Sequence, residues 1–422
     1  MFTKALAVQS TTDAQSSIEG LAYASLQPKV KEKLASDPSF LKNLIQALCN
    51  SPPKSASTYG ALTVLVNLTT YLPILSEEQK RMSQLKAYAN ASKPSQEPDA
   101  LNDDEHVARR GKAVFEAGAI PVLVTHSQHG SLASLNLVVS IVLALSRNVK
   151  LRGQIAQQGG VKLLLHAYPL FPESDVQSQR TTAHALARIL ISANPMHVFG
   201  GSNPLSLTSS IRPLLGLLTD DPNTEQRDLL PVFESLLALT NLASTDDSAR
   251  NPIIRLGWSS ITELLLSNNT MVTRATVELI CNLMQSPEGV AKFADGSKQA
   301  CHMMQILLAL SDAQDFATRR AAGGALASLT EWNTAVKAIL ERDRGVKLLL
   351  GLCTEDEEEL RHRGVVCVLN ILSTSGKVGE WGLKKVKEEG GVEALKECLK
   401  KSKSQEVLEI TVEAVKKLMS TS

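Results

Sequence analysis

The stretch QGGVKLLLHA (158–167) decides the fold, because related copies of it recur along the chain. Each copy has a Gly or another small residue, then a β-branched residue, then a Leu-rich run. The other copies are AGAIPVLV (117–124), SSIRPLLGLL (209–218), SSITELLL (259–266), DRGVKLLLGL (343–352) and EGGVEALKECL (389–399), with a weaker one at CHMMQILLAL (301–310). The apolar residues follow the i, i+3, i+4 spacing of an amphipathic helix. A Gly before the run suits a turn between helices, where a positive φ costs little.

A second recurring string ends each unit. Its copies are TVLVNLTTY (63–71), IVLALSRN (141–148), ALARILIS (185–192), LALTNLAS (237–244), LICNLMQS (279–286), ALASLTEW (325–332) and VLNILSTS (368–375). Alignment of these strings defines one equivalent position, occupied by Asn67, Ala144, Arg188, Asn241, Asn282, Ser328 and Asn370. The steps between them are 77, 44, 53, 41, 46 and 42 residues. Apart from the first, these steps are typical of armadillo or HEAT repeats, which recur every 40–47 residues or so.

The repeats predict an all-α fold, a right-handed α-solenoid of armadillo/HEAT-like repeats. A single repeat cannot bury its apolar face alone, whereas stacked repeats share one continuous core. No stretch shows the sustained two-residue alternation, bounded by turn dipeptides, that would indicate strands.

The first step is longer than a repeat by about 35 residues. We therefore expect residues 1–72 to form the first helices, 73–106 an insertion, and 107–422 the remaining repeats of one continuous solenoid. Within the insertion, SEEQKRMSQLKAYA (76–89) predicts a short helix with a Ser cap, and NASKPSQEPDALNDDE (90–105) predicts a loop. The sequence leaves open whether this insertion contacts a partner or covers the binding surface.

Composition excludes several classes of protein. The net charge is +1, so the chain has no global positive field to attract nucleic acid. The acidic run EDEEE (355–359) and the lysines near the C-terminus are expected to be solvated faces. The six cysteines form no CxxC pair, which is typical of reduced thiols in a cytoplasmic protein. We also predict no signal peptide, because the apolar core of the N-terminus MFTKALAVQSTTDAQ is too short, and no membrane span, because no run of 18 apolar residues occurs.

The sequence contains no motif that indicates an enzyme. GxGxxG, GxxxxGK[ST], HExxH and GxSxG are all missing from it. The pair His126 and His129 has a spacing that could suit a metal, but no neighbouring Cys or carboxylate completes a ligand set. We therefore predict a protein without catalytic residues, cofactor or metal.

The aligned Asn position predicts a binding surface. Residues four and eight positions before it lie on the same helix face. The predicted groove residues are Asn67, Tyr71, Phe233, Asn241, Arg274, Glu278, Asn282, Arg320, Ser328, His362 and Asn370, and Tyr59 lies eight residues before Asn67. An amide offers one acceptor and two donors, so a row of Asn could bracket the peptide units of an extended segment. Arg274 and Arg320 would favour acidic or aromatic groups there. The alternative is that each Asn ties its own helix to a neighbouring loop.

Four further segments of the chain are distinctive: GLAYASLQPKVKEKLASDPSFLKNLIQAL (20–48), NLTTYLPILSEEQKRMSQLKAYANASKP (67–94), LNDDEHVARRGKAVFEAGAIPVLV (101–124) and SRNVKLRGQIAQQGGVKLLL (146–165). These segments resemble the UCS family, the fungal and animal chaperones of myosin motor domains. The resemblance runs from about residue 15 to the C-terminus and looks more like the fungal branch.

The resemblance implies that an armadillo groove receives a segment of the myosin head, and that the protein promotes folding and stability of the motor. The implied partner is the myosin motor domain of the heavy chain. In animal members Hsp90 is recruited by an N-terminal tetratricopeptide domain; this chain has no such 34-residue repeat, so Hsp90 is expected only through other regions. The abrupt start, without a polar cap, predicts that an N-terminal part has been removed.

Two other functions fit the same sequence. One is an armadillo adaptor or scaffold that binds a linear motif of a native partner. The other is a regulator or exchange factor that uses the convex surface. Nucleic acid and membranes are not expected partners, and the sequence decides neither the myosin class nor the oligomeric state.

Overall fold

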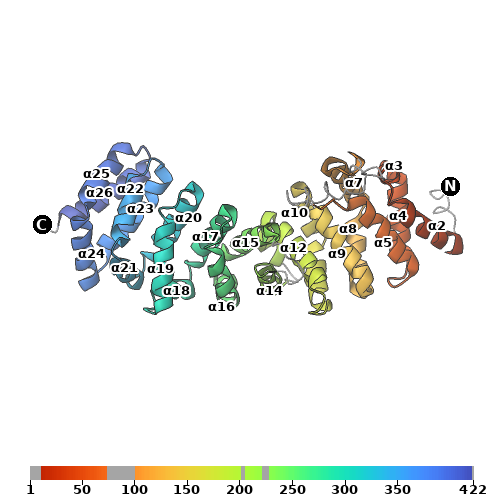
Figure 1. The fold of residues 1–422 in the computed structure, drawn as a ribbon, viewed down its shortest axis with the longest axis horizontal. Helices are drawn as coiled ribbons and strands as arrows, with labels where there is room; N and C mark the ends of the chain where they lie inside the picture. The colour runs from red at the N-terminus through yellow and green to blue at the C-terminus, as the bar shows by residue number, and fades with distance from the viewer. Residues whose placement is uncertain (1–10, 74–99, 201–204, 221–227, 421–422) are drawn as a thin grey trace, which may run out of the picture. The chain divides into compact units, whose positions relative to one another are not determined.

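The structure is a computed structural model that describes residues 11–73, 100–200, 205–220 and 228–420. Within these ranges the chain is helical, with no strand, as Figure 1 shows. The predicted all-α repeat architecture is confirmed. The chain divides into two compact units, residues 1–217 and 218–422, and each is described by itself.

Unit 1 contains the first half of the repeats. Its elements are α2 (Thr11–Ala24), α3 (Pro28–Ala35), α4 (Pro38–Asn50), α5 (Ala56–Thr69), η1 (Ala100–Asn102), α7 (Asp104–Glu116), α8 (Ala119–His129), α9 (Leu132–Ser146), α10 (Val149–Gln157), α11 (Gly160–Ala167), η2 (Tyr168–Leu170), α12 (Val176–Ser192), α13 (Pro195–Phe199) and α14 (Thr208–Gly216).

Unit 2 contains the second half. Its elements are α15 (Leu229–Ala243), α16 (Asp247–Leu264), α17 (Thr270–Leu283), α18 (Pro287–Ala294), α19 (Lys298–Leu310), α20 (Phe316–Leu329), α21 (Asn333–Leu340), α22 (Gly345–Thr354), α23 (Glu358–Ser373), α24 (Gly376–Glu388), α25 (Gly391–Lys401) and α26 (Gln405–Met419).

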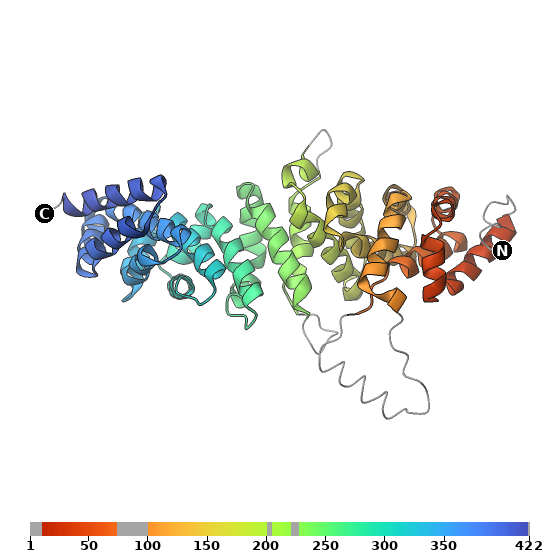
Figure 2. The ribbon, with the colours of Figure 1, turned by 90° about the horizontal axis from the view of Figure 1, so that it is seen from above.

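The last helix of each repeat packs against the last helix of the next. We call these the third helices: α2, α5, α9 and α12 in unit 1, and α15, α17, α20, α23 and α26 in unit 2. Within each unit every third helix contacts the third helix that follows it, as can be followed in Figures 1 and 2. Each unit therefore has a surface formed by third helices alone, which we call its third-helix surface.

The apolar residues of the repeats form the core, as their helical spacing predicts. On α5, Leu62, Leu65 and Leu68 are completely buried, and on α23 so are Val365 and Val368. Each such side chain contributes about 1.5–3 kcal/mol when it leaves water. The stacking of helices supplies this burial, because one repeat alone leaves such residues exposed.

Glycine serves two different purposes at the start of the second helices. Gly118, Gly159 and Gly390 have φ values of 91°, 92° and 86°, as the sequence predicts for the turn before α8, α11 and α25. In DRGVKLLLGL the residue before the helix is Arg344, with a φ of −107°. There Gly345 is required by space instead, because a Cβ on it would collide with the carbonyl oxygen of Ile339.

A recurring arginine joins consecutive repeats. It lies on the first helix of a repeat (α7, α10 or α16) and donates to a carbonyl at the C-terminal end of the preceding third helix. Such carbonyls have no partner within their own helix. The contacts are Arg110 Nε to the Leu68 oxygen at 3.1 Å, Arg152 Nε to the Ser146 oxygen at 2.7 Å, and Arg250 Nε to the Ala243 oxygen at 2.9 Å.

The predicted insertion falls largely on residues 74–99, which lie outside the described residues. At its C-terminal end the expected loop ends earlier than predicted, because η1 covers Ala100–Asn102 and α7 begins at Asp104. Asp103 caps α7 by accepting a hydrogen bond from the His106 backbone nitrogen at 2.8 Å. The acidic LNDDE segment thus forms a helix start, and the end of the insertion at residue 106 stays a prediction.

Candidate functional site

The aligned position of the repeats falls on the third helices, near their C-terminal ends. It is Asn67 on α5, Ala144 on α9, Arg188 on α12, Asn241 on α15, Asn282 on α17, Ser328 on α20 and Asn370 on α23. The predicted alignment thus selects equivalent places on consecutive third helices within each unit.

Asn67 ties α5 to the preceding third helix. Its Nδ2 donates to the Ala22 carbonyl oxygen at 3.1 Å and to the Ser25 hydroxyl at 3.0 Å. These acceptors lie at the end of α2, where helix carbonyls lack partners. Both amide hydrogens of Asn67 are therefore used within unit 1.

The same contact recurs in unit 2. Nδ2 of Asn282 donates to a carbonyl oxygen near the end of α15, and Nδ2 of Asn370 donates to two acceptors at the end of α20. The acceptors are the Thr240 oxygen at 2.9 Å for Asn282, and the Ala327 oxygen at 3.3 Å and Thr330 Oγ1 at 3.1 Å for Asn370.

These bonds change the expected role of the amides. The amide hydrogens of Asn67 and Asn370 join consecutive third helices. This agrees with the alternative that each Asn ties its own helix to a neighbouring part of the chain. Among the described contacts of these three amides, the side-chain oxygens of Asn67, Asn282 and Asn370 and one hydrogen of Asn282 are left for a bound segment. Their place on a client-binding surface stays a prediction.

The predicted basic residues are also engaged by neighbouring repeats. Arg274 on α17 forms a two-pronged contact with Asp315, at 2.5 and 3.1 Å, and Asp315 caps the start of α20. Hydrogen bonds from Arg274 lower the pKa of Asp315 to about 2. The pair therefore stays ionised and joins two third helices.

Arg320 and His362 also face acidic side chains of a neighbouring repeat. Arg320 lies 3.3 Å from Glu359 on α23, and Nε2 of His362 lies 3.7 Å from Glu406 on α26. Each basic side chain thus faces an acidic residue of the next third helix. The expected attraction of Arg274 and Arg320 for acidic groups of a partner is correspondingly reduced, because their charges are already balanced.

A different arginine in unit 2 supplies a charge without an ion pair. Arg363 on α23 makes no ion pair with any residue that the structure describes. A Cβ built on Gly323 would lie 3.1 Å from the Cβ of Arg363, and one on Gly324 would lie 3.9 Å from its Nε. The two glycines of α20 therefore let this side chain lie across the third helices. Sequence reasoning missed Arg363 because it lies seven positions before Asn370 rather than four or eight.

Tyr71 is held at the start of the insertion. The guanidinium carbon of Arg147 lies 4.1 Å from the centre of its ring, and Arg147 also pairs with Asp104 at 2.5 Å. Burial raises the pKa of Tyr71. Arg147 therefore contacts the chain on both sides of the segment 74–99, through Tyr71 before it and Asp104 after it.

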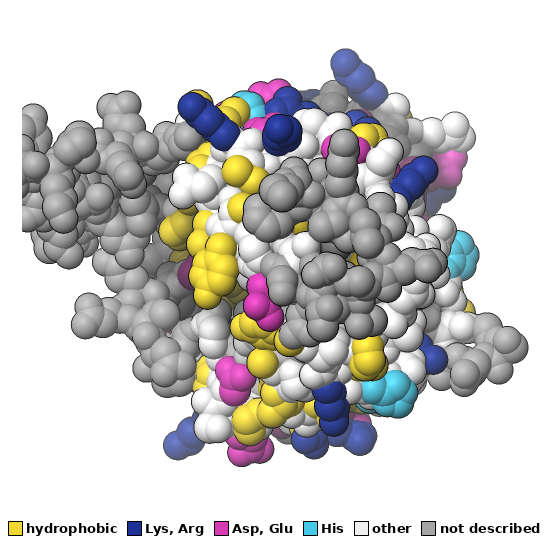
Figure 3. Space-filling view, turned by 90° about the vertical axis from the view of Figure 1, so that its right-hand side faces the viewer, with side chains coloured by type: hydrophobic (Ala, Val, Ile, Leu, Met, Phe, Trp, Pro, Cys, Tyr) yellow, Lys and Arg dark blue, Asp and Glu magenta, His cyan; other side chains and the backbone are white. Residues whose placement is uncertain are grey.

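The third-helix surface of unit 1 contains a pocket of about 610 Å³ between α2, α5 and α9. Tyr23, Leu26 and Tyr59 line it and are 78%, 58% and 46% exposed. Asn67 lies in the same pocket. Figure 3, which views the N-terminal end of unit 1, shows hydrophobic side chains exposed there. Exposed apolar side chains grouped around a polar residue are typical of a binding site.

Sequence reasoning found only part of this pocket. Tyr59 lies on the predicted stripe, eight residues before Asn67, whereas Tyr23 and Leu26 precede the first aligned string. Tyr23 lies on α2 and Leu26 in the turn after it, and their exposure could have been suspected only from a copy of the repeat that the alignment did not contain. The other predicted residues, Phe233, Asn241, Glu278 and Ser328, are half-buried on the third helices of unit 2.

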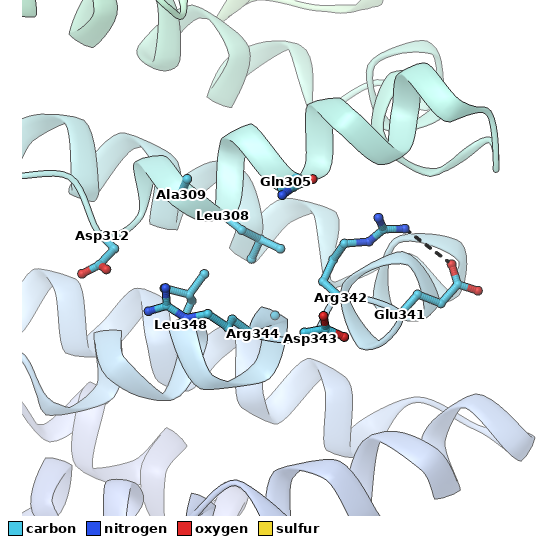
Figure 4. Close-up of a pocket in the computed structure, with 10 residues that line it drawn as sticks. Gln305, Leu308, Ala309, Asp312, Glu341, Arg342, Asp343, Arg344 and Leu348 are labelled. Atoms are coloured by element: carbon cyan, nitrogen blue, oxygen red, sulfur yellow. Dashed lines mark ion pairs between the residues drawn. The ribbon is translucent and has the colours of Figure 1, made fainter.

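A second hollow, of about 450 Å³, lies in unit 2 away from the third helices. Figure 4 shows it between α19 and the turn that leads into α22, with Gln305 and Leu308 facing Arg342 and Leu348. Within it Arg342 and Glu341 form an ion pair at 4.0 Å. No predicted site residue lines this hollow.

The candidate metal residue His126 and the lengths of the helices bear on the predictions about a metal site and a membrane span. His126 is 4% exposed and its Nε2 lies 2.8 Å from the Leu48 carbonyl oxygen, so it packs inside unit 1. Among the described residues, no group of three His, Cys, Asp or Glu is placed to hold a metal ion. In the same part of the chain, no helix is both long and apolar enough to cross a bilayer.

Comparison with known proteins places the chain among homologues. It is 33% identical over 361 residues to Ring assembly protein 3 of Schizosaccharomyces pombe, which covers 84% of this chain and 47% of that protein. It is 30% identical over 371 residues to Protein unc-45 homolog B of Xenopus laevis, covering 86% and 38%. The structure of UNC-45 from Drosophila melanogaster matches all of this chain and 51% of that one, with a TM-score of 0.82 and 28% identity. No family model matches.

The chain is homologous to these proteins over most of its length. The predicted resemblance to the UCS family is thereby confirmed over most of the chain. The chain spans about half the length of the relatives that it matches, or less.

Proposed function

We propose that this chain is a chaperone for myosin motor domains. In this proposal the third-helix surface holds a partly folded or labile segment of the motor, and so promotes its folding, its stability and actomyosin function in the cytoplasm. The homology to these relatives and the exposed apolar pocket of unit 1 support the proposal. It includes no catalytic step, and Hsp90 enters it only through regions other than those described here.

The unit 1 pocket is the observation that carries the proposal. Tyr23, Leu26 and Tyr59 are exposed side chains that would lose contact with water if an apolar side chain of a client lay between them. Each square ångström of apolar surface removed from water contributes about 25 cal/mol. The Asn67 oxygen beside them can accept a hydrogen bond from a client backbone N–H, which suits an extended segment.

Such binding can protect a motor without ATP. A protein that binds the labile state lowers the concentration of free aggregation-prone chains. The client refolds after release, so the affinity must be moderate and the binding reversible. The exposed side chains of the unit 1 pocket fit this requirement.

The test uses a purified myosin motor domain at a mild heat-shock temperature, with this chain at equal molarity and light scattering as the readout. We expect the wild-type chain to suppress scattering, and the double variant Tyr23→Ala, Tyr59→Ala to lose most of that effect. Leu170→Ala is the matched control, because Leu170 is also 46% exposed but lies on η2, outside the pocket.

Two outcomes would contradict the proposal. If the wild-type chain leaves scattering unchanged, it is not a chaperone of this motor. If the double variant protects as well as the wild type, the pocket is not the client site. Tight binding of a short peptide from a native partner, without any effect on scattering, would favour the adaptor function instead.

A further inference from the structure

Arg363 carries an unbalanced positive charge on the third-helix surface of unit 2. It lies on α23, is exposed, and forms neither an ion pair nor a hydrogen bond with any residue that the structure describes. The basic residues of the predicted groove, Arg274, Arg320 and His362, each face a carboxylate of the following repeat instead. The guanidinium of Arg363 is therefore able to bind an anionic group from outside the chain.

Two glycines of α20 let the Arg363 side chain extend across the neighbouring helix. A Cβ on Gly323 would lie 3.1 Å from the Cβ of Arg363. A Cβ on Gly324 would lie 3.9 Å from Nε of Arg363 and 3.1 Å from Sγ of Cys281 on α17. Nε of Arg363 thus lies over α20, on the path from α23 to α17, and these three helices follow one another in Figure 1.

A carboxylate bounds this part of the surface on the α17 side. Glu278 is half-buried and forms no ion pair with any described residue. Burial raises the pKa of the Cys281 thiol, the charge of Arg363 lowers it, and the charge of Glu278 raises it further. Both charges therefore act on Cys281 although they do not pair with each other, and the surface has a negative end on α17 and a positive end towards α23.

We propose that Arg363 selects the client, so that the segment held on unit 2 carries an acidic side chain where it passes α20 and α23. The carboxylate of that side chain accepts hydrogen bonds from the planar guanidinium, whose donors match the two carboxylate oxygens. Glu278 repels the same group over α17, and this repulsion fixes the acidic residue at the α23 end of the bound segment. This preference rests on the proposed chaperone function and adds to it the kind of client residue that unit 2 recognises.

The expected contribution is modest and depends on salt. An exposed ion pair adds little to binding, so loss of Arg363 should weaken the binding of an acidic segment only about three- to tenfold. Added salt should reduce this difference, because it screens exposed charges. A contribution of this size leaves the client free to dissociate, as the proposed function requires.

Overlapping peptides that cover a myosin motor domain, probed with the labelled chain, test the preference. The peptide that binds best and contains an acidic residue is then made with Asp, Asn or Lys at that position, and its dissociation constants are measured by fluorescence anisotropy. We expect the wild-type chain to bind the Asp form most tightly and the Lys form least tightly. Arg363→Met should weaken the Asp form about three- to tenfold and leave the Asn form unchanged, whereas Arg363→Lys should keep most of the preference.

Two further variants separate the site from general charge effects. Glu278→Gln should strengthen binding of the Asp form, because it removes the repulsion on the α17 side. Arg212→Met is the matched control: Arg212 is also exposed and also lacks an ion pair within the described residues, but it lies on α14 of unit 1. It should leave all three peptide forms unchanged. Circular dichroism confirms that each variant folds.

Several results would overturn the assignment of Arg363. They are the absence of any bound acidic peptide, equal binding of the three forms by the wild-type chain, and an unchanged preference in Arg363→Met. Equal weakening of the Asp and Asn forms in Arg363→Met would show that the guanidinium stacks on an aromatic ring of the peptide, which also contradicts acidic selection. Failure of the proposed function is distinguishable, because the wild-type chain would then leave light scattering of the heated motor unchanged whatever the peptides show.

Discussion

Substitution of Arg110 by Met should destabilise unit 1 far more than the same change at its neighbour Arg109. Arg110 is 1% exposed and Arg109 is 60% exposed at the side chain, yet both contact the same carboxylate, Glu32. The pair therefore separates the effect of burial from the effect of charge.

The magnitude follows from the contacts that Arg110 makes. It donates to the Leu68 oxygen at 3.1 Å, the Leu101 oxygen at 2.6 Å and Glu32 at 2.5 Å. Breaking a buried ion pair by removing one partner costs about 3–5 kcal/mol. Glu32 is 18% exposed and keeps Arg109, so the lower end of this range, about 3 kcal/mol, is expected. Arg109→Met should cost about 1 kcal/mol or less, as for other exposed ion pairs.

The local effect should appear on both sides of the insertion. Leu68 precedes the segment 74–99 and Leu101 follows it, so Arg110 joins the chain on both sides of that segment. Burial of Glu32 opposes its ionisation, but hydrogen bonds from Arg110 and Arg109 outweigh this effect and keep its pKa below the ordinary value. Without Arg110, this carboxylate and two carbonyls lose their main donor, and α3, α5 and α7 should separate more readily.

Urea unfolding followed by circular dichroism measures the loss, and hydrogen exchange with mass spectrometry locates it. All three tryptophans lie in unit 2, at 258, 332 and 381, so their fluorescence provides an internal reference for that unit. Exchange should accelerate in peptides from α3, α5 and α7 of Arg110→Met. Equal losses for Arg109→Met and Arg110→Met, or faster exchange confined to unit 2, would refute the reasoning.

Three further changes have expected outcomes. Acid should weaken unit 2 as Asp315 protonates. Its folded pKa of about 2 lies below the ordinary 3.8, so the contribution is complete above pH 4 or so and is lost as the pH falls through about 2. It amounts to about 1–2 kcal/mol after allowance for partial exposure, and Asp315→Asn should flatten acid titrations of stability in this range. Asn370→Ala should cost about 1–2 kcal/mol in urea unfolding, because two acceptors at the end of α20 lose their donor; a loss of client binding without any change in stability would contradict this role. Gly118→Ala, at a φ of 91°, should lower the melting temperature through about 1–2 kcal/mol of strain, whereas Gly153→Ala inside α10 should raise it slightly; the same sign for both would rule out the backbone argument.

The candidate site was predictable in position but not in its bonding. Repeat alignment placed Asn67, Asn282 and Asn370 at equivalent points on the third helices. It could not show that their amide hydrogens bond to the preceding third helix, because the acceptors lie 40–45 residues away in sequence. The basic stripe misled for a similar reason, since Arg274 meets its carboxylate, Asp315, only after two repeats stack.

The sequence by itself determined that the chain is an all-α repeat array that resembles the UCS family. That information is local, in the spacing of apolar residues, in the glycines before helices and in the period of the strings. Only the tertiary structure decided which polar groups hold the repeats together and which face outward. Stacking engages Arg274, Arg320 and the amide nitrogens of Asn67, Asn282 and Asn370. It leaves Tyr23 and Tyr59 exposed, because a side chain's partners depend on which distant helices pack against it.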